Sequence, residues 1–438
     1  MYRVWDFVTN YSLLLIAGAL LALVWANVDP HSYHQMVEYP IWFNDLVGID
    51  ASKWLHTYGE EFGITEVGDV TRVLTAHFLV NDILMAFFFA IAAKEVWEAI
   101  ILESGSLRGK KAATPLFATA GGMIGPIAVY LGLAALLGSD TYDAVSRGWA
   151  IPTATDIAFS YLVGRLVFGA GHPAVRFLLL LAIADDAAGL VILAIFYPSA
   201  EVAPEWLLVS LGAAIFVYVA FNWLPRRLDR GNQDRPNSTW MRQKLSFWPY
   251  LLAGCISWFA FQKSGLHPAL GLLPIVPTLP HADRAFGIFA EAEQYLTDLL
   301  NHVEHLLKHP VEVILFLFGL FNAGVEFSSI GSPTWLVLGG LVIGKPLGVL
   351  LFGWFAAGPM KLGLPSGMRM VDLLVIGCVA AIGFTVSLFL ASVAFDSTAM
   401  LGDIRLQEAA KMGALFSFGA ALVAIVAGKL TGVQKRNT

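Results

Sequence analysis

Charged residues are scarce in this sequence. Asp, Glu, Lys and Arg make up 14% of the 438 residues, against about 25% in ordinary globular domains. Hydrophobic residues reach 57%, and the mean hydropathy is +0.68. A soluble chain of this length could not cover its surface with so few charges, so we infer that a lipid bilayer is its solvent.

Cysteine and net positive charge are scarce too. The two cysteines, Cys255 and Cys378, cannot form a disulfide framework, and their apolar surroundings predict small buried side chains. The net charge of −6 offers no basic surface for nucleic acid. Disordered proteins, disulfide scaffolds and nucleic-acid-binding proteins are thereby excluded, and no motif predicts a cofactor.

The apolar residues gather in stretches that can cross a membrane, which takes about 20 helical residues. They predict an all-α membrane protein with one transmembrane domain over residues 1–438. Twelve such stretches occur, at approximately 11–27, 76–102, 113–137, 148–170, 173–198, 204–223, 246–263, 266–282, 309–330, 332–357, 370–396 and 407–430. The eighth is the weakest, because four prolines interrupt it.

Basic residues in the connections predict the orientation, since short cytoplasmic loops carry an excess of Lys and Arg. With twelve spans, the basic segments 103–112 and 224–245 and the basic tail share one side. Residues 28–75 hold eight carboxylates against Lys53 and Arg72, and they lie on the other side. We therefore expect cytoplasmic termini, an extracytoplasmic hairpin or loop at 28–75 and an acidic, histidine-containing cytoplasmic loop at 283–308.

Asp185 and Asp186 lie near the centre of the apolar stretch LLLLAIADDAAGLVILAIF. On insertion scales each acid there costs about 2.5–3.5 kcal/mol, so a structural role is hard to justify. Successive helical residues point about 100° apart, so one carboxylate can line a cavity while the other meets a neighbouring helix. Such a pair can bind a bare monovalent cation or take up protons instead, which is the chemistry of exchange.

Three further spans carry residues that are unusual inside a membrane helix. Pro152 and Asp156 interrupt the fourth span, and the eleventh has Gly377 and Gly383 near its centre. Two interrupted helices in separate halves favour an inverted-repeat transporter with its site at the midplane. In the tenth span, Lys345 is too deep to reach water and needs a carboxylate or the negative end of a half-helix.

Other ionisable residues leave alternatives open. Interface anchoring or ion pairing explains Asp82, Lys94, Glu95 and Glu98 of the second span as well as a functional role does. His302, His305 and His309 recur on one helical face. Histidine titrates near physiological pH, so these three indicate a pH sensor, although the same spacing also fits an adventitious metal site or a solvated face.

The chain resembles the NhaA family of sodium/proton antiporters over nearly its whole membrane region. Five motifs carry the resemblance, namely Gly148-Trp-Ala-Ile-Pro-Thr-Ala-Thr-Asp-Ile-Ala-Phe159, Ala182-Ile-Ala-Asp-Asp186, Phe321-Asn-Ala-Gly-Val325, Ile343-Gly-Lys-Pro-Leu-Gly348 and Ile382-Gly-Phe-Thr385. The region departs from the family pattern at 93–99 and in the acidic loop before the ninth span.

The resemblance implies a twelve-helix fold in which the interrupted fourth and eleventh helices cross. It implies that Asp185 and Asp186 form the ion site and that Thr155, Asp156 and Lys345 support it. Candidate pH-response residues are Glu95, Glu304, His305 and Asp82. Residues 28–75 then suggest a hairpin used for homodimerisation.

We therefore predict a transporter, not an enzyme, in a bacterial inner membrane. It exchanges cytoplasmic Na⁺ or Li⁺ for external protons, electrogenically and under pH control. Asp186 is the expected main ligand and Asp185 its proton-carrying partner, while Lys345 either pairs with Asp185 or neutralises the half-helices together with Asp156. The rivals are a sodium-coupled symporter of an organic solute and an intramembrane aspartyl protease, although adjacent acids suit the protease poorly.

Overall fold

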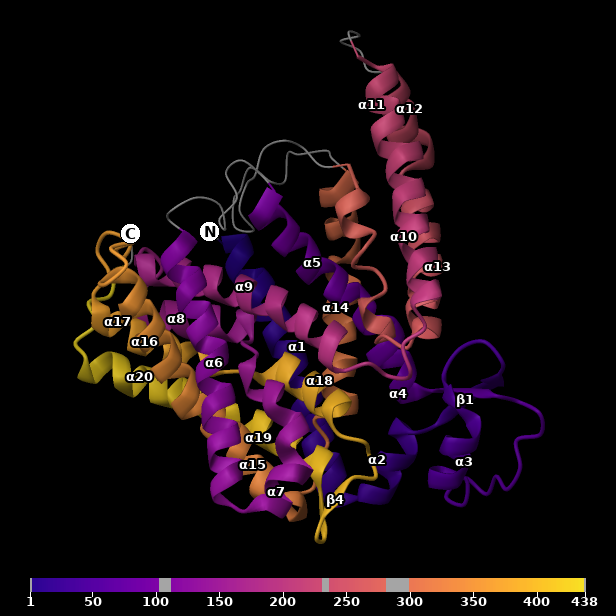
Figure 1. The fold of residues 1–438 in the computed structure, drawn as a ribbon, viewed down its shortest axis with the longest axis horizontal. Helices are drawn as coiled ribbons and strands as arrows, with labels where there is room; N and C mark the ends of the chain where they lie inside the picture. The colour runs from indigo at the N-terminus through magenta and orange to yellow at the C-terminus, as the bar shows by residue number, and fades with distance from the viewer. Residues whose placement is uncertain (1, 102–111, 231–235, 281–298, 437–438) are drawn as a thin grey trace.

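The computed structural model describes residues 2–101, 112–230, 236–280 and 299–436, without the side chains of residues 2–13, 242, 301, 304, 305 and 308. Helices make up most of this part of the chain (Figure 1). Up to the middle of the chain they are α1 (Tyr2–Val28), α4 (Ala76–Phe78), the π-helical turn η1 (Leu79–Leu84), α5 (Met85–Ile101), α6 (Ala113–Leu136), α7 (Ser139–Val145), the 3-10 helix η3 (Ser146–Thr153), α8 (Ile157–Phe168), α9 (Pro173–Phe196), α10 (Pro204–Tyr218), the π turn η4 (Val219–Trp223) and α11 (Leu224–Leu228).

The second half of the chain is helical in the same way. Its elements are α12 (Pro236–Trp240), the π turn η5 (Met241–Leu245), α13 (Trp248–Ser264), the 3-10 turns η6 (Pro268–Leu270) and η7 (Val276–Thr278), α14 (Leu299–Asn322), the 3-10 turn η9 (Phe327–Ser329), α15 (Ser332–Gly339), the π turn η10 (Gly340–Gly344), α16 (Lys345–Ala357), α17 (Met370–Ala380), α18 (Phe384–Ala394), strands β4 (Met400–Leu401) and β5 (Ile404–Arg405), α19 (Leu406–Phe416), the 3-10 turn η11 (Ser417–Gly419) and α20 (Ala420–Leu430).

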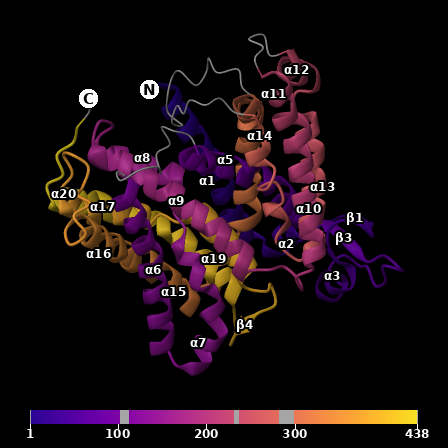
Figure 2. The same cartoon turned by 45° about the horizontal axis from the view of Figure 1, so that its top comes forward.

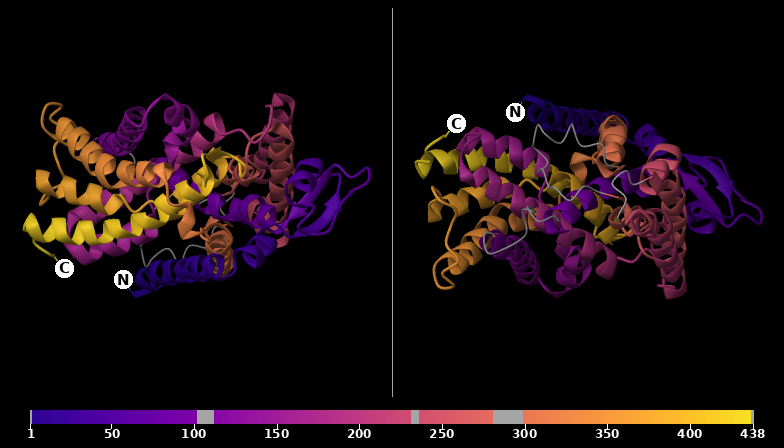
Figure 3. Two further views of the ribbon diagram at one scale, coloured as in Figure 1. Left: turned by 90° about the horizontal axis from the view of Figure 1, so that it is seen from below. Right: turned by 90° about the horizontal axis from the view of Figure 1, so that it is seen from above.

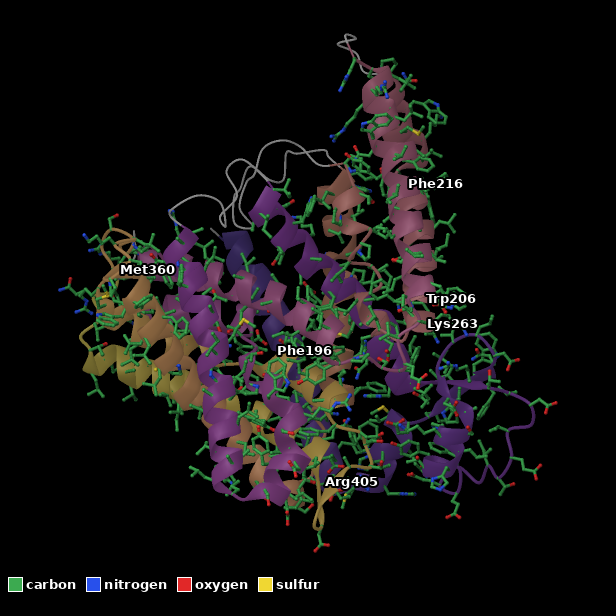
Figure 4. All side chains as sticks on the ribbon, in the orientation of Figure 1. Phe196, Trp206, Phe216, Lys263, Met360 and Arg405 are labelled. Carbon is green, nitrogen blue, oxygen red and sulfur yellow. The ribbon has the colours of Figure 1, made fainter. Side chains whose placement is uncertain are left out.

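Six continuous helices of the described part are long and apolar enough to cross a membrane, at 76–101, 113–136, 173–196, 204–228, 332–357 and 406–430. A seventh crossing arises if α17 and α18, which meet at a bend of 55°, form one broken span. Three further apolar helices are shorter. Large apolar side chains such as Phe196 and Phe216 are 56% and 67% exposed on the outside of the bundle, as lipid-facing residues are (Figure 4).

The bundle has two distinct ends. Both chain termini lie at one end, which we call the terminal face (Figures 1 and 2). At the opposite end lie α7, the β4–β5 ribbon and the sheet formed by residues 28–75, and we call this end the hairpin face. The paired helices α10 and α13 stand at the edge of the bundle and are joined by a buried contact between the Ser210 and Ser257 hydroxyls at 2.7 Å.

Helices α6 and α16 pack closely against each other. A Cβ atom at Gly121 would lie 2.2 Å from the Gly348 carbonyl oxygen, and one at Gly348 would lie 1.9 Å from the Gly121 oxygen. Only glycine therefore permits this approach, which is how helices pack where no hydrophobic effect drives them together. The contact holds the first turn of α16, and with it Lys345, inside the protein.

Residues 28–75, the hairpin region, contain α2 (Pro30–Val37), α3 (Ala51–Tyr58) and a sheet of order β1-β3-β2. The strands are β1 (Pro40–Asn44), β2 (Ile49–Asp50) and β3 (Arg72–Thr75), and both pairings are antiparallel. The region extends from one end of the bundle (Figure 3). It is attached by the Tyr33 hydroxyl, which donates to the Leu320 carbonyl at 2.9 Å, and by an ion pair of Lys53 with Asp396 at 2.9 Å.

Three expectations from the sequence are wrong in detail. The eighth apolar stretch is not a helix over its described residues, because prolines limit it to the 3-10 turns η6 and η7. The last part of the loop expected at 283–308 is helical, because α14 begins at Leu299. Cys378 is buried, but Cys255 is exposed, since its side of α13 faces outward.

Candidate functional site

Two helices are interrupted at the centre of the bundle, and the interruptions contact each other. The chain leaves η3 at Thr153, is extended through Thr155 and resumes as α8, while the other helix stops at Ala380 and resumes as α18. The Asp156 amide donates to the Ile382 carbonyl at 2.7 Å, and the Thr155 hydroxyl donates to the Ala380 carbonyl at 3.2 Å. Each interruption therefore supplies hydrogen-bond partners to backbone groups that have none within their own broken helix. Non-helical backbone inside a membrane needs such partners.

The structure places Asp156 at the start of two half-helices. Its carboxylate caps α8 by accepting from the Phe159 amide at 3.2 Å. It also accepts from the Thr385 hydroxyl at 2.9 Å and from the Thr385 amide at 3.4 Å, at the start of α18. Asp156 is 4% exposed, so its negative charge acts at close range on the positive ends of both half-helices.

Lys345 lies at the start of α16 and is fully buried, with 0% exposure. Its ammonium donates to Asp185 Oδ2 at 2.9 Å and to the carbonyl oxygen of Thr153. The Thr155 hydroxyl donates to the same Asp185 oxygen at 2.7 Å. The deep lysine therefore has both a carboxylate partner and a free carbonyl of the interrupted helix, and the removal of either would leave it a costly buried charge.

Asp186 has a different environment from its neighbour on α9. Asp185 is 3% exposed and hydrogen-bonded, whereas Asp186 is partly exposed and accepts no hydrogen bond from the described residues. Asp186 lines a cavity with otherwise apolar walls, formed by Phe88, Phe89, Ala92, Gly189, Leu190, Leu193, Val386, Phe389 and Leu390. Because the two carboxylates point apart, one is engaged with Lys345 while the other is open to the cavity.

Carboxylate, hydroxyl and carbonyl oxygens therefore gather where the interrupted helices meet α9. Oxygen ligands of this kind suit hard cations such as Na⁺. No group of three or more His, Cys, Asp or Glu side chains within the described ranges could hold a resident metal ion.

The candidate pH-response residues lie apart from one another. Glu95 lies on α5, and its charge acts on Asp186. Asp82 lies on η1, where its carboxylate is 3.6 Å from His267 Nδ1. Glu304 and His305 fall within α14, but their side chains are outside the described residues. Lys94 and Glu98 form an ion pair at 3.0 Å, which is one of the roles that the sequence left open for them.

A polar cluster toward the hairpin face was not predicted from the sequence. The side-chain amides of Asn81 and Asn322 donate to each other's oxygens at 3.0 and 2.8 Å, and both residues are nearly fully buried. His77 Nε2 lies 2.8 Å from the Asn81 amide nitrogen, and the Ser392 hydroxyl donates to the Asn322 oxygen at 3.1 Å. Asn322 occurs in the motif Phe321-Asn-Ala-Gly-Val325, and that position was the available signal.

Comparison with known proteins identifies the family. Residues 4–430 match the family model described as Na⁺/H⁺ antiporter 1. The chain is 71% identical to the Na⁺/H⁺ antiporter NhaA of Jannaschia sp. (strain CCS1), over 100% of both chains. This chain belongs to the NhaA family. It is a Na⁺/H⁺ antiporter, a multi-pass membrane transporter and not an enzyme.

More distant NhaA antiporters match over nearly the same length. That of Desulfitobacterium hafniense (strain DSM 10664 / DCB-2) is 44% identical over 98% of this chain and 96% of its own. That of Geobacter sulfurreducens is 42% identical over 97% of each chain. A sodium–proton antiporter structure from Methanocaldococcus jannaschii is similar at 15% identity and a TM-score of 0.40, over 98% of this chain and 97% of that one.

The geometry around Asp185 also argues against the protease rival. Such an enzyme activates one water between two carboxylates, whereas here Lys345 and Thr155 occupy the Asp185 oxygen. The second acid points to a different neighbourhood of the NhaA-family fold.

Proposed function

We propose that Asp185 and Asp186 bind the transported Na⁺ or Li⁺ and carry the protons exchanged for it. The observation that carries this proposal is the contrast on α9 between a carboxylate held by Lys345 and its neighbour open to a cavity. Asp186 is the main cation ligand, because its oxygens are available to an ion that enters the cavity. Asp185 completes the site when its bond to Lys345 opens.

Lys345 and the transported cation compete for Asp185 Oδ2, because both are positive and both bind that oxygen. Sodium binding displaces the lysine, which then releases a proton. Sodium release restores the ion pair and the proton. Support for this scheme over a purely structural lysine comes from Asp156, which is engaged with Thr385 and the start of α8 and not with Lys345.

The proposed cycle exchanges two protons for one sodium ion. One proton is carried on the Lys345–Asp185 pair and the other on Asp186, so each turnover moves one net charge across the membrane. A membrane potential that is negative inside then favours sodium export.

The proposed orientation places the terminal face in the cytoplasm of a bacterial inner membrane. It is supported by the basic segments of the sequence and by the position of both termini at one end (Figure 2). In this arrangement the chain crosses the bilayer twelve times, and the interrupted fourth and eleventh helices cross at the site. The hairpin region joins two copies into a homodimer through β1, an edge strand that exposes Ile41 and Trp42.

Glu95, Glu304, His305 and Asp82 set the pH response in this proposal. Support for Glu95 is the action of its charge on Asp186, and support for Asp82 is its pairing with His267. The proposal assigns the other two by their place near the start of α14, toward the terminal face.

The charge count is tested by exchange under an imposed potassium diffusion potential. Purified protein is reconstituted with a pH-sensitive dye inside the vesicles, and sodium-driven lumen alkalinisation is followed with and without valinomycin. We expect the initial rate to change in proportion to the voltage. One sign of the potential should raise the rate, and the opposite sign should lower it. Vesicles with Asp186→Asn give the leak rate, and a rate that ignores the voltage rules out the two-to-one count.

A further inference from the structure

A glycine forms the part of the cavity wall next to Asp186. Gly189 lies three residues after Asp186 on α9 and lines the same cavity. Residues three apart share one face of a helix, with their Cβ positions about 5–6 Å apart. A cation that the Asp186 carboxylate binds inside the cavity therefore lies close to the backbone of Gly189.

Close helix packing does not account for this glycine. A Cβ atom at Gly189 would meet no neighbouring heavy atom of the described residues within 4 Å, whereas one at Gly121 would lie 2.2 Å from the Gly348 carbonyl oxygen. A glycine inside a helix is also destabilising relative to alanine. The absence of a side chain at position 189 therefore leaves open space in the cavity and serves no contact between helices.

The wall contributed by α5 and α18 is tightly packed. Phe389 lies edge-on to Phe89 with 5.0 Å between the ring centroids. Its ring also contacts those of His267 and Phe318, at centroid distances of 4.9 and 6.4 Å, and its side chain is only 1% exposed. Close-packed interiors are hardly compressible. This wall therefore cannot move outward to make room for a larger ion.

The cavity itself is small. Its volume is about 10 Å³, which is the lower limit for holding one water molecule. A hydrated cation is too large for such a space, whereas bare Li⁺ and Na⁺ are both smaller than a water molecule. The lining residues other than Asp186 are Phe, Ala, Gly, Leu and Val, which have no side-chain oxygen to offer as a ligand. Discrimination between cations at this carboxylate therefore depends on their size.

We propose that Gly189 sets the upper size limit for the cation at Asp186 and thereby determines the preference between Na⁺ and Li⁺. The missing side chain leaves room for a bare sodium ion between the carboxylate and the packed phenylalanines. Any side chain at this position narrows the cavity on the side where the ion binds. The inference rests on the proposed function, because it requires the transported cation to bind Asp186.

Two substitutions change the size of the cavity in opposite directions. Gly189→Ala adds a methyl group, which leaves space for Li⁺ but crowds the larger Na⁺. Val386→Ala removes two methyl groups from the wall on α18, and the double variant combines both changes. The matched control is Gly132→Ala on α6, because Gly132 is exposed and an added Cβ atom there would likewise meet no neighbouring heavy atom within 4 Å.

The experiment measures both ions by two methods at pH 8.5, where protons compete least. Dye-monitored exchange in proteoliposomes gives the half-saturating concentrations of Na⁺ and Li⁺, and isothermal titration calorimetry gives their Kd values on the purified protein. The quantity compared is the sodium value divided by the lithium value. Gly189→Ala should raise this ratio about tenfold, which is within reach of one methyl group in a pocket.

The other variants are expected to change the same ratio differently. Val386→Ala should lower it about threefold, because the larger ion gains more from added space. The double variant should return to within about twofold of wild type, since one wall gives back the room that the other takes. Gly132→Ala should keep the wild-type ratio.

The outcomes distinguish the role of Gly189 from the site assignment. Equal changes for both ions in Gly189→Ala, or a double variant whose ratio stays as high as that of Gly189→Ala, overturn the size limit. If Gly189→Ala is not recovered from the membrane, Val386→Ala decides, because an unchanged ratio in that variant also overturns it. Asp186→Asn is measured beside these variants, and exchange that survives this change overturns the proposed function instead.

Discussion

At the scale of single residues, the two adjacent aspartates differ in what they hold. Asp185 accepts hydrogen bonds from Thr155 and Lys345, whereas Asp186 faces the cavity. Asp186→Asn should therefore abolish exchange and leave the thermal stability near that of wild type. Asp185→Asn should impair exchange severely and also lower the stability, because Lys345 loses its charged partner. Dye-monitored exchange and thermal unfolding in detergent measure the two effects, and equal stability losses would contradict the distinction.

The Lys345–Asp185 pair allows a second prediction by a double-mutant cycle. Lys345→Met leaves a buried carboxylate and Asp185→Asn leaves a buried ammonium, so each should destabilise the protein by about 3–5 kcal/mol. The double variant should lose clearly less than the sum, because neither uncompensated charge remains. Unfolding of all four proteins in one detergent gives the coupling free energy. Additive losses would show that the pair does not exist in the membrane.

Residue types alone indicated much of this site. A deep lysine and two acids in apolar helices had to find partners, so a contact of Lys345 with a carboxylate could be predicted. Asp185 was the carboxylate expected to pair with Lys345, and the structure has that contact, but the sequence could not choose between a proton-carrying lysine and a purely structural one. The contact of Thr385 with Asp156 joins residues 229 positions apart, and no local pattern encodes it.

At the scale of elements, the contact between the two interruptions depends on a glycine. A Cβ atom at Gly383 would lie 2.7 Å from the Ala154 carbonyl oxygen. Gly383→Ala should therefore push the interruptions apart, cost about 1–3 kcal/mol of stability and reduce exchange about tenfold or more, since small misplacements of ligands are severe.

The matched control for that substitution is Gly212→Ala. Gly212 lies on the exposed side of α10, where an added Cβ atom would meet no atom within 4 Å. Its replacement should leave exchange unchanged and stability equal or slightly higher. Both variants are compared in the dye assay and by thermal unfolding. Wild-type activity in Gly383→Ala would show that the interruptions tolerate separation.

Elements were predicted unevenly from the sequence. Length and hydropathy identified helices such as α6 and α9 nearly to their ends. The same criteria failed at the eighth apolar stretch, because an apolar run can be buried without being helical. They also missed two π turns, namely η1, which contains Asn81, and η10, which precedes Lys345. A π turn holds one extra residue, and the composition of the sequence does not reveal it.

At the scale of the whole molecule, the proposed pH response and the proposed ion site are separated in space. The proposed ion site lies where α8, α9 and α18 meet, while His302 and His309 lie near the start of α14 and are exposed. Sodium and protons compete for the same carboxylates, so the apparent affinity for sodium should rise with pH without any sensor. A sensor at the terminal face adds a shift to that dependence but does not replace it.

The triple substitution His302→Ala, His305→Ala and His309→Ala tests this separation. By mass action, saturating sodium should move the pH of half-maximal activity to lower values in wild type, because the cation displaces protons from Asp185 and Asp186. We expect the triple variant to have a different midpoint at each sodium concentration but the same displacement by sodium. The measurement is the dye assay across pH at several sodium concentrations. An unchanged midpoint would remove the histidines from the response, and a wild-type midpoint that does not depend on sodium would remove the competition itself.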